Sequence, residues 1–153
     1  MKNATGVILF DGYRVESFQF NWDVSKEMAE NGNYRFRIGY TDQTCPDESK
    51  QIDLIIHIFS NEYYQYEDSP LKLELILAGK FHMANDTKWD DRWNSNALAI
   101  LFPYARSIIS SFTAQSGLEM INLPTFNTRV LMENETMLAE KAANNSIEEV
   151  GKL

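Results

Sequence analysis

Residues 97–115 read ALAILFPYARSIISSFTAQ, an apolar run with small polar residues between its apolar side chains. The apolar side chains recur at intervals of three and four residues, the spacing that places them on one face of an α-helix. They are Leu98, Leu101, Phe102, Ala105, Ile108, Ile109 and Phe112. Ser116 and Gly117 follow as a stop signal. Because Pro103 lies inside the pattern, we expect this helix to kink near Ala99–Ile100.

Four stretches upstream of this helix have the composition and spacing of β-strands. They cover residues 13–20, 34–40, 52–59 and 71–81. In the first stretch the apolar positions slip by one residue near Glu16, which indicates a bulge. The third is apolar on both faces and should therefore be covered on both. Downstream, Asn127 is a plausible N-cap for a second helix that runs to about Ala143.

Length, net charge and cysteine content limit the kinds of protein that this sequence can encode. The 153 residues suit one domain, 1–153, whose acidic stretch 133–153 is expected to fray. With 22 acidic and 14 basic residues the net charge is −8, which argues against a nucleic-acid partner. Residues 1–11 hold only a short apolar run, so we expect neither a signal segment nor membrane insertion. Cys45, the single cysteine, fits a reducing compartment, and the sequence thus predicts a cytoplasmic protein.

Catalytic chemistry is not indicated by any motif. Two histidines and one cysteine without short spacing predict no metal site. The chain has no glycine-rich phosphate loop and no nucleophile elbow, so we expect no cofactor and no enzyme activity. If the protein were an enzyme after all, His57 or Asp91 would be the residues to test.

Apolar side chains exceed what one small core requires. The chain holds nine Phe, seven Tyr, three Trp and six Met, the residue types that form adaptable binding surfaces. In the fourth strand, a row of leucines at alternate positions would consume one whole sheet face of a monomer. This surplus predicts that some apolar faces meet a partner.

The helix contains a run that resembles the helix motif of the SecB export chaperones. The run is Ile100–Arg106 (ILFPYAR), an amphipathic helix segment with an internal proline. Its motif residues are Leu101, Phe102, Pro103, Tyr104 and Arg106. Residues 121–124 (INLP) resemble the link that follows in that family, and Asn127 and Leu131 stand at two positions of its second-helix start.

The resemblance implies an α+β fold, a four-stranded antiparallel sheet with a long kinked helix and a second C-terminal helix packed on it. It also implies a homotetramer built as a dimer of dimers. The implied oligomer contacts are Leu73, Leu75, Leu77, Ser107, Ser110, Ser111 and Ala114.

The activity implied by the resemblance is the ATP-independent holding of unfolded or nascent polypeptides in apolar grooves. A groove lined by apolar side chains captures such chains without reading their sequence. The candidate groove residues are Phe18, Phe20, Tyr34, Phe36, Ile38, Met120, Leu123 and Phe126.

The family meets the motor protein SecA through an acidic sheet surface, which this sequence mostly lacks. Glu74 matches one acidic position, but Lys72 stands at the neighbouring apolar contact, and Val15 and Gln19 stand at the acidic positions of the first strand. SecA and an aggregation-prone antitoxin-like client therefore remain alternative partners. A different class, a small-ligand carrier with an aromatic-lined pocket, is the second hypothesis for the whole protein.

Overall fold

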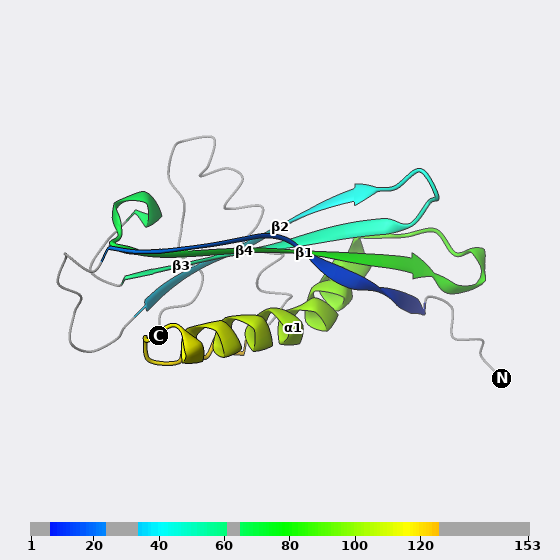
Figure 1. The fold of residues 1–153 in the computed structure, drawn as a ribbon. Coiled ribbons are helices and arrows are strands. Elements are labelled where there is room, and N and C mark those ends of the chain that lie inside the picture. Colours follow the sequence, from blue (N-terminus) through cyan, green and yellow to red (C-terminus); the bar gives the residue numbers. More distant parts are fainter. Residues whose placement is uncertain (1–6, 24–33, 61–64, 126–153) are drawn as a thin grey trace.

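The computed structural model describes residues 7–23, 34–60 and 65–125 (Figure 1). Its strands are β1 (Ile8–Trp22), β2 (Tyr34–Thr44), β3 (Lys50–Ser60) and β4 (Leu71–Met83), and its long helix is α1 (Asn94–Gln115). Short 3-10 turns are η1 (Tyr66–Asp68), η2 (Ala84–Asp86) and η3 (Asp91–Trp93). The strands form one antiparallel sheet in the order β1-β4-β3-β2, with α1 along one face (Figure 1). The predicted α+β arrangement is confirmed, and the expected second helix lies outside the described residues.

Strand β1 is longer than the sequence predicts because two bulges let it continue. Its register against β4 shifts between Phe10 and Gly12 and again between Val15 and Ser17. The second shift is the slip predicted at Glu16. At the first shift Gly12 adopts a φ of 112°, a left-handed conformation that costs glycine little. The two bulges keep the apolar side chains of β1 on one face of the sheet.

The hairpin between β2 and β3 is also longer than expected. Residues 41–44, predicted as loop, pair with residues 50–53 of β3. Backbone pairing at this exposed end of the sheet does not require apolar side chains, which is why the pattern missed it. The turn closes through backbone hydrogen bonds from Cys45 N to Ser49 O (2.8 Å) and from Glu48 N to Cys45 O (2.9 Å).

Helix α1 packs on the sheet face that carries the leucines of β4, which we call the helix face. Leu98, Leu101, Ala105 and Ile109 of α1 are buried there. The helix approaches the sheet closely at Gly79, where a Cβ atom would lie 2.5 Å from a methyl carbon of Leu101. The helix continues through Pro103 and changes direction in its N-terminal half (Figure 1). By length and mean hydropathy (1.3) alone, the stretch 91–115 could also cross a membrane.

The other face of the sheet, the open face, has less cover. It carries Lys72, Glu74 and Ile76 of β4, which alternate with the buried leucines. Phe59 of β3 is nevertheless fully buried here, because the ring of Tyr66 and the guanidinium of Arg37 lie over it. The prediction that β3 is covered on both faces therefore holds at this end of the strand.

The chain after α1 folds back along the helix and extends the core. Ile121 and Leu123 are buried. The hydroxyl of Thr113 donates to the Ile109 carbonyl and accepts from the Ile121 amide, both at 2.8 Å. Burial, with the nearby carboxylate of Glu119, raises the pKa of Tyr34 at the start of β2. The segment thus covers the β2 side of the helix face.

Replacing Gly79 by alanine should destabilise the protein by about 1–3 kcal/mol, because the new methyl group collides with buried Leu101 and Phe81. Urea unfolding of the two glycine variants provides the measurement. Gly39→Ala is the matched control, since nothing lies within 4 Å of a Cβ at that strand position. It should be neutral or slightly stabilising. Equal loss of stability in both variants would contradict the close approach of α1.

Thr113→Val should cost about 1–3 kcal/mol in unfolding free energy, because it leaves the buried amide of Ile121 without its acceptor. Faster hydrogen exchange of that amide would locate the effect. Gln115→Ala, at the exposed end of the same helix, should stay within about 0.5 kcal/mol. If the Ile121 amide exchanged at the same rate in Thr113→Val, the segment would be held by other contacts.

Candidate functional site

Strand β1 presents a continuous apolar row on the helix face, which we call the β1 strip. It consists of Ile8, Phe10, Tyr13, Val15, Phe18, Phe20 and Trp22. None of these side chains is fully buried, and Tyr13 and Val15 are 42% and 47% exposed. The central strands β3 and β4 differ, because their side chains on the same face are fully buried. The β1 strip is therefore an apolar surface left partly in contact with water.

Helix α1 forms a wall along the β1 strip. The ring of Tyr104 lies 4.7 Å from that of Tyr13 and 5.7 Å from that of Phe10, measured between centroids. Further along α1, Phe112 meets Phe18 and Phe20 edge-on at 4.7 and 4.9 Å. Such aromatic contacts hold the side chains in place without covering them. Together the β1 strip, Tyr104 and Phe112 form a preformed apolar surface, which we call the apolar shelf.

The backbone of β1 adds hydrogen-bonding capacity to this shelf. Within the described residues, β1 pairs only with β4 and forms one edge of the sheet. An edge strand presents unpaired N–H and C=O groups along its outer side. The shelf therefore offers apolar side chains and a strand edge together, the two features that an extended polypeptide can match.

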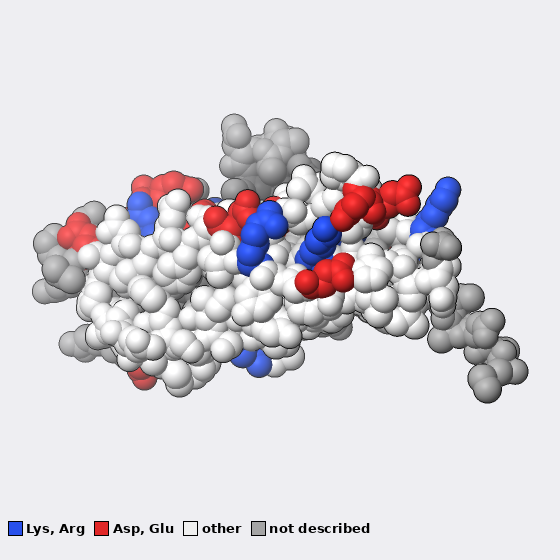
Figure 2. Space-filling model, turned by 45° about the vertical axis from the view of Figure 1, so that its right-hand side comes forward, with Lys and Arg blue, Asp and Glu red and all other residues white. Residues whose placement is uncertain are grey.

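The exposed side of α1 is almost uncharged. Arg106 is the single charged residue of α1, and its guanidinium donates to the hydroxyl of Thr125 at 3.0 Å and lies over the ring of Phe102. The exposed residues of the helix are Asn96, Ala99, Pro103, Tyr104, Ser107, Ser111, Ala114 and Gln115. In Figure 2 the charged side chains gather along the side of the open face, and the α1 side carries few. An uncharged helix surface suits contact with another apolar or weakly polar surface.

The leucine row of β4 has a different explanation from the one predicted. Leu73, Leu75 and Leu77 are fully buried beneath α1 of the same chain. The argument that the row needs a second subunit is therefore wrong, because alternation in a sequence does not reveal which element covers a face. Of the other predicted oligomer contacts, Ser107, Ser111 and Ala114 are exposed on α1. Ser110 instead donates to the Ile121 carbonyl and the Asn122 side chain.

The predicted groove residues fall into two groups. Tyr34, Phe36, Ile38 and Leu123 are between 0 and 8% exposed, and this burial corrects their assignment to a groove. The physical reason is that α1 and the segment after it cover β2. Phe18 and Phe20 belong to the β1 strip, and Met120 is 49% exposed. Phe126 lies outside the described residues. The other residues of the strip were not predicted as groove residues, although the period-two spacing resumes after each bulge.

The motif residues of α1 serve the core and the shelf. Leu101 and Phe102 are buried, Pro103 is exposed, and Tyr104 forms part of the shelf wall. The motif is thus a packing motif with one residue turned toward the candidate binding surface.

Glu74, the predicted motor-docking residue, is engaged within the open face. Its carboxylate lies 2.7 Å from His57 Nε2 and accepts a hydrogen bond from Ser17 at 3.5 Å. The ring of Tyr66 stacks on His57 with centroids 4.5 Å apart. Burial and the carboxylates of Glu74 and Glu67 raise the pKa of Tyr66. Glu74 is thus part of a local structural cluster and is not a freely presented charge.

The residues considered for catalysis do not converge in the described part of the chain. His57 is paired with Glu74, and His82 Nδ1 lies 2.7 Å from Asp11. Asp91 is exposed at the first turn of η3. Among the described residues no group of three His, Cys, Asp or Glu side chains could hold a metal ion.

Comparison with known sequences finds a similar protein but no matching family model. No family model matches the chain. An uncharacterized protein of Methanocaldococcus jannaschii is 28% identical over 127 residues, which are 82% of each chain. A relative without a described role leaves the function to structural argument.

Comparison with solved structures relates the fold to a chaperone. The SecB-like chaperone of Mycobacterium tuberculosis, solved in complex with a ChAD peptide from the HigA1 antitoxin, superposes with a TM-score of 0.60 at 14% identity. The match covers 78% of this chain and 90% of that chain. A protein of unknown function from Streptococcus agalactiae superposes with a TM-score of 0.45 at 10% identity, over 80% of this chain and all of that one. The chain has a SecB-like fold.

Proposed function

We propose that this protein is a chaperone-like holder of unfolded polypeptides that works without nucleotide. The observation that carries the proposal is the β1 strip, an apolar row at a sheet edge that one helix leaves partly uncovered. The SecB-like fold supports a chaperone-like role, since the SecB-like chaperone of similar fold was solved with a bound antitoxin peptide.

The chemistry of an unfolded chain matches this surface. Such a chain exposes apolar side chains together with backbone groups that lack partners. The strip offers an apolar surface for the former, and the open edge of β1 can pair with the latter. Because backbone pairing is independent of side-chain identity, binding of this kind tolerates many sequences.

Self-association would strengthen binding that is weak at each site. We propose a homotetramer, a dimer of dimers, in which the uncharged side of α1 with Ser107, Ser111 and Ala114 contacts another subunit. Several strips in one assembly would then hold one client at several points, so that their effective affinities multiply.

The charges on the open face favour a single dedicated client over precursor proteins that are delivered to a motor for export. Glu74 is the one acidic residue that matches the expected docking surface, and its carboxylate is already paired with His57. Lys72 adds a positive charge to the same face. An antitoxin-like, aggregation-prone client therefore fits this chain better than delivery to SecA.

Val15→Asp should weaken binding of an unfolded client by about tenfold, because a bound chain would bury the new carboxylate against apolar surface. Val15 is exposed, so the variant should fold. Fluorescence anisotropy of a labelled, reduced and denatured client measures affinity, and light scattering measures suppression of its aggregation without nucleotide.

Gln19→Asp is the matched control, since it adds the same charge to an exposed position on the open face of the same strand. It should bind the client as the parent protein does. Sedimentation of both variants separates lost client binding from lost assembly. Equal binding by the two variants, or no binding by the parent, would refute the proposal.

A further inference from the structure

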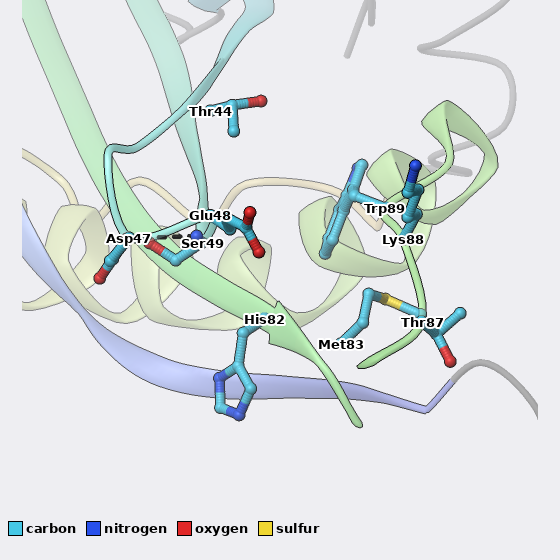
Figure 3. A pocket seen from close by; sticks show the side chains of 9 residues that line it. All are labelled: Thr44, Asp47, Glu48, Ser49, His82, Met83, Thr87, Lys88 and Trp89. Atoms are coloured by element: carbon cyan, nitrogen blue, oxygen red, sulfur yellow. Dashed lines mark hydrogen bonds between the residues drawn. The ribbon is translucent and has the colours of Figure 1, made fainter. Parts of the chain in front are cut away.

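A pocket of about 550 Å³ lies at the end of the sheet where three segments meet (Figure 3). The β2–β3 turn, the end of β4 and the link to α1 each contribute one wall. The lining residues are Thr44, Asp47, Glu48, Ser49, His82, Met83, Thr87, Lys88 and Trp89. The pocket is separate from the β1 strip, which uses none of these residues.

Trp89 is held in a fixed orientation in this pocket. Its indole Nε1 donates to the Asn94 side chain at 2.8 Å, and its ring packs against Phe81. Asn94 is 3% exposed and donates in turn to Asp42 at 2.8 Å, which fixes the start of α1 on the β2–β3 hairpin. The pocket therefore has a preformed aromatic wall, with the Met83 side chain beside it (Figure 3).

Two of the four ionisable side chains that line the pocket are already paired. Asp47 binds Lys80 at 2.8 Å and accepts from Ser49, and these hydrogen bonds hold the pKa of Asp47 below its usual value. His82 is paired with Asp11. The charged residues that remain are Glu48 and Lys88.

The charged groups of Glu48 and Lys88 extend in different directions. In Figure 3 the Glu48 carboxylate extends into the pocket toward the ring of Trp89, whereas Lys88 lies beyond Trp89 on the side away from Glu48. Glu48 also adopts a φ of 67°, a left-handed conformation that glycine or asparagine would adopt more easily. A carboxylate thus faces an aromatic wall across open space.

We infer that this pocket binds one basic side chain, an arginine or lysine of a polypeptide partner. The apolar stem would lie along Trp89 and Met83, and the cation would sit between the indole face and the Glu48 carboxylate. Cation–π attraction and a charge-assisted hydrogen bond would act on the same group. The net charge of −8 attracts cationic segments from a distance. This inference goes beyond the holding of unfolded chains and does not depend on it.

Titration of the ¹⁵N-labelled full chain with N-acetyl-arginine amide tests the site. The Trp89 indole and Glu48 backbone resonances should shift together and saturate. N-acetyl-norleucine amide has an apolar stem without charge and should bind at least about fivefold more weakly. N-acetyl-glutamate amide should cause no saturable shift, and binding of this probe as tight as that of the arginine probe would overturn the inference.

Glu48→Gln should weaken the arginine probe by about fivefold or more, since it removes the charge and keeps the shape. Glu119→Gln is the control, because it removes the same charge at an exposed position after α1. If both variants lost the same affinity, the net charge of the protein alone would explain the loss, and the inference would be overturned. A blocked Ala-Ala-Arg-Ala-Ala peptide should bind more tightly than N-acetyl-arginine amide if the ligand is a polypeptide. Equal affinity of the two probes would refute the inference that the basic side chain belongs to a polypeptide.

Discussion

A single helix lies on the apolar face of a four-stranded sheet in this protein, and the helix is narrower than the sheet. The rest of the structure depends on this difference in width. The outer strands of a four-stranded sheet lie about 15 Å apart, whereas a helix with its side chains is about 10–12 Å wide. Helix α1 approaches β4 closely at Gly79, and the helix-face side chains of β3 and β4 are fully buried beneath it. The segment with Ile121 and Leu123 covers the β2 side. Within the described residues nothing equivalent covers the β1 side, and the β1 strip remains part-exposed.

Because of this difference in width, the two sides of the sheet have different surfaces, one charged and one largely uncharged. Charged side chains gather on the side of the open face (Figure 2). On this face His57 pairs with Glu74, and Tyr66 stacks on His57. The α1 side carries the exposed parts of the strip and a helix surface with one charged residue, Arg106. Apolar surface that stays exposed costs free energy in water, so its retention beside a strand edge is the physical reason for proposing a polypeptide partner.

Sequence reasoning could predict the elements better than their contacts. Short local patterns of apolar residues predicted all four strands, and three- and four-residue spacing predicted α1, because each pattern is local. The leucines of β4 were misassigned, since a period of two gives a shared face and not the element that covers it. The His57–Glu74 pair depends on strand register, which the sequence does not state. The pocket of Glu48 and Trp89 was missed because its three segments each resemble ordinary loops and meet only in the fold.

Hydrogen exchange with and without a permanently unfolded client tests the central claim most directly. If the β1 strip and its edge hold the client, amides of β1 between Tyr13 and Trp22 should exchange at least about tenfold more slowly at saturating client. Amides of η1 on the open face should be unchanged. Protection that appears on η1 and not on β1, or that is absent from both, would contradict the account.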